Sequence, residues 1–240
     1  MSRPISPRRV RAIFTKELTE YRRNRSIVST MAIIPAIFVL APLIQIFSSP
    51  ASALAGGDRL LYMLGIPAIV PAVVAAYTVV GERQQGTLEP VLTTPIRREE
   101  FLLGKALAAL VPSLGVSYAV YGVVLAIIEL FASSPVASAV VRGPEIVAQV
   151  VFTPLVATWS IWLGIAISTR ASDIRVAQQL SMLISLPSFA VAALIAFDAI
   201  HPSLGLALAL GAALMILDVL GWRVTSAAFD RERLIANSKA

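Results

Sequence analysis

The chain has no cysteine, a single histidine and few charged residues, and each shortage removes a class of protein. Without cysteine there are no disulfides, thiolate metal sites or cysteine nucleophiles. His201 alone cannot form a histidine-based metal centre, because such a centre needs several ligands. Charged residues make up only 14 % of the chain, whereas a soluble domain has about 25 %.

Apolar residues are correspondingly abundant. They make up 57 % of the 240 residues, and the mean hydropathy is +0.80. A globule of this length has too little interior to hide so much apolar surface from water. This composition argues against a soluble enzyme, a disordered chain and a nucleic-acid-binding domain, and it indicates a membrane protein.

Six apolar runs are long enough to cross a bilayer, which takes about 20 residues of helix. They are continuous and do not alternate, so they predict helices and not strands. We therefore expect an all-α membrane protein with a six-span transmembrane domain over residues 27–222. The expected spans cover residues 27–47, 60–80, 107–131, 146–168, 176–197 and 204–222.

The positive charges predict the orientation of these spans. With six spans both termini lie on one side, and that side then carries 18 of the 20 lysines and arginines, all except Arg59 and Arg142. Because Lys and Arg in short flanking segments stay in the cytoplasm, we expect both termini to be cytoplasmic in a cell membrane. The basic N-terminus and long first run indicate a retained span and not a signal peptide.

Residues 1–26 are expected to form a cytoplasmic or interfacial amphipathic helix. Its apolar residues fall on one helical stripe, and most of the other positions are basic or polar. One interpretation is a topology anchor whose arginines face anionic lipid. The other is a cytoplasmic elbow that contacts a partner and leads into the first span. The stripe consists of Val10, Ile13, Phe14, Leu18 and Tyr21.

The loop over residues 82–100, between the second and third spans, contains two sets of residues that are typical of the first turn of a helix. Thr87 is followed by Glu89 and Pro90, and Thr94 is followed by Pro95. A short helix over about residues 88–93 is therefore expected, with apolar residues that pack either against the bundle or in a groove of a partner.

Residues 82–95 (ERQQGTLEPVLTTP) and 102–105 (LLGK) resemble the motif of ATP-binding-cassette (ABC) transporter permeases of the type-2 exporter family. Residues 13–18 resemble the N-terminal elbow of that family, residues 168–187 its connection between the fourth and fifth spans, and residues 229–234 its tail. The resemblance covers nearly the whole chain. One departure is the connection between the fifth and sixth spans, which is only about six residues long here, whereas family members often carry re-entrant helices or an external domain.

The resemblance implies a permease subunit that exports a substrate and is driven by a separate ATPase. The loop would be the coupling helix that docks on the nucleotide-binding subunit, the elbow a second contact, and Ser172, Asp173 and Arg175 a third. The coupling positions carried over are Glu82, Gly86, Thr87, Leu88, Glu89, Leu92, Thr94 and Pro95, with Phe14, Glu17 and Leu18 in the elbow.

The sequence is consistent with a need for such a partner. It contains no G-x-x-x-x-G-K-[ST] phosphate-binding loop, so this chain cannot bind ATP by that route. We expect no enzyme activity and no cofactor in this chain, with ATP and Mg²⁺ bound by the partner. A second copy, most simply in a C2 homodimer, would complete the transport path.

Two spans carry polar stripes that are candidates for a substrate path. Small hydroxyl residues on one face of a membrane helix usually serve close packing, and a surface that faces the substrate is the alternative. The stripes are Ser113, Ser117 and Tyr121 in the third span, and Gln178, Ser181, Ser185 and Ser188 in the fifth.

We therefore expect the chain to export a drug, lipid or similar amphiphile out of the cytoplasm, driven by a separate ATPase subunit through the coupling helix. The alternative is an ATPase-independent secondary transporter or a channel-like protein. It would need ionisable groups in the middle of the membrane. Glu129 and Asp218 lie near span ends, where interfacial water is sufficient to solvate them.

Overall fold

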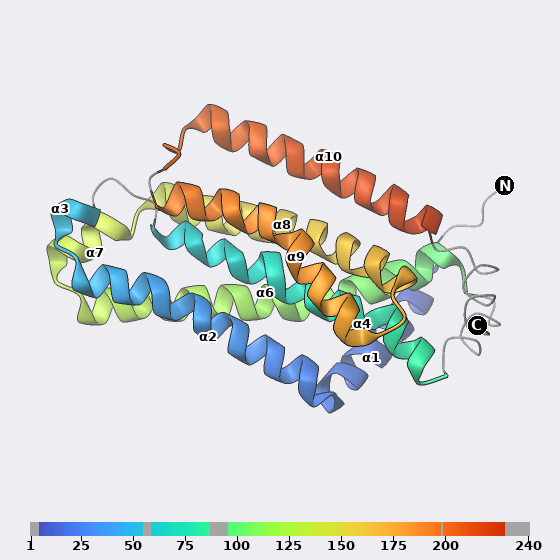
Figure 1. Cartoon of the computed structure of the whole chain (residues 1–240). Coiled ribbons are helices and arrows are strands. Elements are labelled where there is room, and N and C mark those ends of the chain that lie inside the picture. Colours follow the sequence, from blue (N-terminus) through green and yellow to red (C-terminus); the bar gives the residue numbers. More distant parts are fainter. Residues whose placement is uncertain (1–4, 55–58, 87–95, 198, 229–240) are drawn as a thin grey trace.

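A computed structural model describes residues 5–54, 59–86, 96–197 and 199–228. Within these ranges the regular structure is helical, with no strand (Figure 1). The helices are α1 (Pro7–Arg23), α2 (Arg25–Ser48), α3 (Ala51–Leu54), η1 (Arg59–Leu64), α4 (Gly65–Gln84), α6 (Arg98–Phe131), α7 (Ser134–Val140), α8 (Gly143–Arg170), α9 (Ile174–Ala196) and α10 (Leu204–Ala228).

Six of the described helical segments are long and apolar enough to cross a membrane, as the sequence predicted. They are α2, η1 with α4, α6, α8, α9 and α10. Each overlaps one of the expected spans, and most extend beyond it by a few residues; α6 begins nine residues before the expected start. Pro35, Pro42, Pro112, Pro154 and Pro187 all lie inside helices.

Helix α4 is the centre of the bundle. In its most apolar stretch 94 % of the residues are buried, and α2, α6, α8 and α9 all pack against it. Small side chains allow the close approach: a Cβ atom on Gly164 of α8 would lie 2.5 Å from the Ala72 carbonyl oxygen of α4. The Ser168 hydroxyl of α8 also accepts hydrogen bonds of 3.0 Å from the N–H groups of Val79 and Val80.

The two ends of the bundle differ. At one end lie α1, the end of α4, the start of α6 and the connection from α8 to α9, and we call it the basic end because of the arginines and lysines of these segments (Figure 1). The opposite end carries the short helices α3 and α7, which pack against each other. The connection from α9 to α10, residues 197–203, is as short as the sequence indicated.

Helix α10 lies on the outside of the bundle, mainly against α8 (Figure 1). None of its most apolar stretch is buried. Trp162 of α8 and Trp222 of α10 make an edge-to-face contact with ring centroids 5.2 Å apart, and the Thr225 hydroxyl donates to the Trp162 carbonyl at 3.2 Å. These contacts attach the end of α10 to the bundle.

Candidate functional site at the basic end

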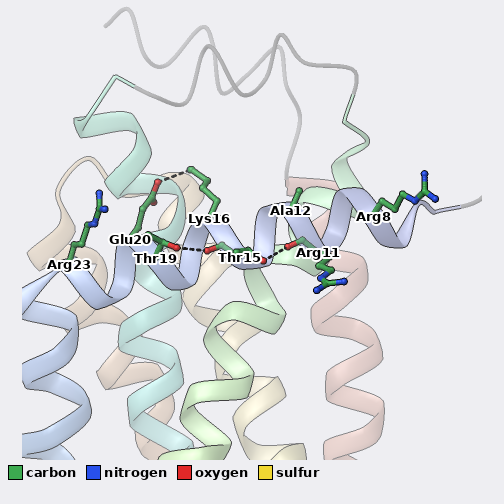
Figure 2. A pocket seen from close by; sticks show the side chains of 8 residues that line it. All are labelled: Arg8, Arg11, Ala12, Thr15, Lys16, Thr19, Glu20 and Arg23. Atoms are coloured by element: carbon green, nitrogen blue, oxygen red, sulfur yellow. Dashed lines mark hydrogen bonds and ion pairs between the residues drawn. The ribbon is translucent and has the colours of Figure 1, made fainter.

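Helix α1 lies across the ends of the other helices, and α6 is its main neighbour (Figure 2). Three of its residues, Ile13, Glu17 and Tyr21, are buried at four-residue spacing, so they lie on one face. A close approach of the two helices is possible because α6 has Gly104 at the crossing point. A Cβ atom there would lie 2.6 Å from the Cβ atom of Ile13.

A buried ion cluster joins α1 to the two helices that flank residues 87–95. Lys105 of α6 is 0 % exposed, and its ammonium lies 2.8 Å from Glu17 of α1 and 3.1 Å from Glu82 of α4. It also donates to the Thr78 carbonyl at 2.9 Å. Lys16 of α1 adds a second cation, 2.6 Å from the Glu82 carboxylate. We call Lys16, Glu17, Glu82 and Lys105 the basic-end cluster.

Electrostatics explains why these charges are tolerated inside the protein. Burying an ion costs several kcal/mol unless an opposite charge and hydrogen bonds compensate it, and here two buried carboxylates face two ammonium groups. Partial burial by itself lowers the pKa of Lys16, but the carboxylates of Glu82, Glu17 and Glu20 outweigh it, so the pKa lies above its ordinary value. Lys16 therefore stays charged at physiological pH.

A second contact fixes the start of α1 to the start of α6. The Glu100 carboxylate is buried and accepts from the N–H groups of Ser6 at 2.9 Å and Arg97 at 3.1 Å. The Arg9 guanidinium donates to it at 3.3 Å. Helix α1 is therefore held against α6 by Glu100 near its first turn and by Lys105 further along.

The end of α4 is also attached to the connection between α8 and α9. The Arg83 guanidinium donates to the carbonyls of Ala171 at 2.9 Å and Thr169 at 3.1 Å. Asp173 accepts from the first N–H groups of α9, and these bonds hold its pKa below its ordinary value. The segment that contains Ser172, Asp173 and Arg175 therefore lies beside the base of the loop that follows α4.

The predicted coupling positions divide into two groups. Glu82 is 4 % exposed and belongs to the basic-end cluster, and Gly86 lies in a turn with a φ of 68°. The others lie outside the described residues, as does the short helix expected over 88–93; they are Thr87, Leu88, Glu89, Leu92, Thr94 and Pro95.

In the elbow, Phe14 and Leu18 are half-buried, whereas Glu17 is buried against Lys105 and faces the bundle. The outward side of α1 is instead lined by other residues, which border a groove of about 720 Å³ (Figure 2). Lys16 pairs with Glu20 at 3.2 Å, and three arginines add to the positive charge of this side. The lining residues are Arg8, Arg11, Ala12, Thr15, Lys16, Thr19, Glu20 and Arg23.

Sequence reasoning missed the partners of Lys105 and the role of Glu100. A lysine directly beside an apolar run is a signal that could have found Lys105, because such a lysine needs an anionic partner when helix packing buries it.

The two polar stripes differ in burial and in hydrogen bonding. Ser113, Ser117 and Tyr121 are all buried within the bundle. On α9, Ser181 and Ser185 are buried, whereas Gln178 and Ser188 are partly exposed. The Ser185 hydroxyl donates to the Ser181 carbonyl at 2.7 Å. A bond of this kind satisfies the serine hydroxyl within its own helix.

Six long apolar helices, with an amphipathic helix ion-paired across their ends, define a multi-pass α-helical membrane protein. Residues 11–210 match the family model described as ABC-2 family transporter protein. The chain therefore belongs to the ABC-2 transporter family and is a membrane permease component of an ABC-2 type transporter. Such subunits lack nucleotide-binding motifs and generally pair with ATPase subunits. A comparison with curated proteins found no significant match.

Proposed function

We propose that this permease moves a drug, lipid or similar amphiphile out of the cytoplasm, driven by separate ATPase subunits that dock at the basic end. The basic end then faces the cytoplasm, and so do both termini. The positive-inside rule supports this orientation, because all but two of the 20 lysines and arginines belong to that side. ATP and Mg²⁺ belong to the partner.

The basic-end cluster is the observation that carries the proposal. Residues 87–95 connect α4 to α6 in the sequence, and the ion pair between Glu82 and Lys105, at 3.1 Å, joins these two helices. Glu17 and Lys16 connect the same pair to α1, which leads into α2 through Asn24 alone. A force applied to the loop is therefore delivered to α1, α4 and α6 together, as ATP-driven coupling requires.

Two copies of the chain are proposed to form the complete membrane part of the transporter. Apolar side chains of α2, α9 and α10 face outward, and a twofold axis is the commonest way in which identical subunits assemble. The stripes on α6 and α9 are proposed to contribute to the substrate path of each copy.

The experiment targets the loop that is expected to dock. In the permease co-expressed with its ATPase subunit, Glu89→Arg and a deletion of residues 88–93 should each abolish co-purification and stimulation of ATP hydrolysis. Glu129→Arg is the matched control, because this exposed glutamate lies near the other end of α6. Full ATPase stimulation by the deletion variant would refute the proposed coupling.

A further inference from the structure

Helix α6 carries three hydroxyl groups that no part of the described chain satisfies. Ser113, Ser117 and Tyr121 are spaced four residues apart, are at most 4 % exposed, and have hydroxyl oxygens without a hydrogen-bond partner in the structure. Serine and threonine hydroxyls inside helices can bond to a backbone carbonyl of the preceding turn, as Thr78 and Thr169 do here. The hydroxyls of Ser113 and Ser117 do not make this bond.

A second polar stripe lies on α8, the neighbour of α6. Glu145, Gln149 and Thr153 have the same spacing and are at most 3 % exposed. The Gln149 amide N–H donates to the Thr153 hydroxyl at 3.3 Å, but its carbonyl oxygen has no partner among the described residues. Glu145 is near Arg142, with 4.0 Å between the guanidinium and the carboxylate.

The two stripes meet near the end opposite the basic end. Helices α6 and α8 pack against each other, and Tyr121 and Glu145 end the two stripes on the side away from the basic end. The Tyr118 hydroxyl donates to the Val150 carbonyl at 2.9 Å, which fixes the two helices at the same depth. Glu145 lies in the first turn of α8, so it marks the outer end of the contact between the two stripes, which we call the polar seam.

The polar seam would be energetically unfavourable if it contained no water. Each buried polar group without a partner costs about 1–3 kcal/mol, and lipid supplies no water to satisfy it. Alanine would fill the positions of Ser113 and Ser117 without that cost. Close packing alone therefore does not account for the side chains present, whereas water or a polar ligand between α6 and α8 does.

We propose that the facing stripes of α6 and α8 form a hydrated path in the outer half of the bundle, which takes water and small cations. The cation preference follows from the chemistry of the lining. The Gln149 carbonyl and the Glu145 carboxylate only accept hydrogen bonds, and hydroxyl oxygens can also coordinate a cation. This inference rests on the proposed substrate path and assigns its outer half to α6 and α8, with a cationic group as the favoured part of the substrate.

The absence of cysteine in the chain makes a direct test possible. Ser117→Cys and Thr153→Cys are nearly isosteric, and a thiol reacts with methanethiosulfonate reagents as the thiolate, which forms only where water reaches it. Purified single-cysteine permease in nanodiscs would be treated with the 2-(trimethylammonium)ethyl reagent. Ala108→Cys is the matched control, since Ala108 is fully buried on the same helix and lies nine residues before Ser117, on the opposite face. Gel filtration would confirm that each variant folds.

We expect the cysteines at 117 and 153 to react at least tenfold faster than the cysteine at 108. Equal rates at all three positions would overturn the proposal and show a dry seam. The anionic 2-sulfonatoethyl reagent should react more slowly than the cationic one, and Glu145→Gln should narrow that difference. Equal rates for both reagents would overturn the cation preference. Neither ATP nor the ATPase is present, so a failure of coupling leaves this result unaffected, and a dry seam leaves the docking proposal standing.

Discussion

Lys105→Met removes the cation on which both buried carboxylates of the basic-end cluster depend. Methionine has a similar length, so the change deletes the charge with little loss of volume. Glu17 then keeps its ion pair with Lys16, at 3.5 Å, and Glu82 keeps its ion pair with Lys16, at 2.6 Å. Breaking a buried ion pair by removing one partner costs about 3–5 kcal/mol. We expect the free energy of unfolding to fall by that amount, measured by SDS titration in mixed micelles and far-UV circular dichroism.

A double variant separates the ion pair from packing. Glu17→Gln together with Lys105→Met removes both charges, and replacing both members of a buried pair is often nearly neutral, so at least about 2 kcal/mol of the loss should return. Arg98→Met is the control: Arg98 is exposed and pairs with Glu99 at 3.0 Å, and exposed pairs contribute about 0–1 kcal/mol. The reasoning is wrong if Lys105→Met costs no more than this control, or if the double variant is no more stable than Lys105→Met.

Three further predictions concern α1, α9 and the assembly. Gly104→Ala should destabilise the protein by about 1–3 kcal/mol in the same unfolding assay, because its Cβ would meet Ile13, whereas Gly115→Ala on the same helix has open space and should be neutral or stabilising. Asp173→Ala should speed hydrogen exchange in the first turn of α9, and Asp173→Asn should not. Because the pKa of Asp173 is lowered in the folded protein, its cap stabilises the fold at pH values above the ordinary aspartate pKa. That stabilisation is lost as the pH falls through the lowered pKa. Light scattering in detergent should give the mass of two chains, and a monomer would contradict the proposed pair.

The long helices were predictable because their signal is local. A run of about 20 apolar residues needs no knowledge of its neighbours to be identified as a span, and the stripe of α1 is visible over three turns. The residues of this stripe lie in α1, which is helical over Pro7–Arg23. Its orientation was harder to predict, because the sequence gives no reason to expect that Glu17 lies on the buried face beside Ile13 and Tyr21.

The contacts of the site depend on residues that are far apart in the chain. Lys105 is 88 residues from Glu17, so no local pattern connects them. The stripe of Glu145, Gln149 and Thr153 follows a helical spacing that a search for hydroxyl groups alone does not detect. In both places the sequence shows the polar residue, and only the packing of the helices shows which residue faces it.

The peripheral position of α10 has a consequence for how the protein is made. Helix α10 is the last of the described helices to leave the ribosome, and the other spans pack around α4 with almost no help from it. Those spans can therefore pack against α4 while α10 is still being synthesised. Helix α10 then packs beside Trp162 on a bundle that has already formed, so an error in the synthesis of α10 leaves the packing of the earlier spans intact.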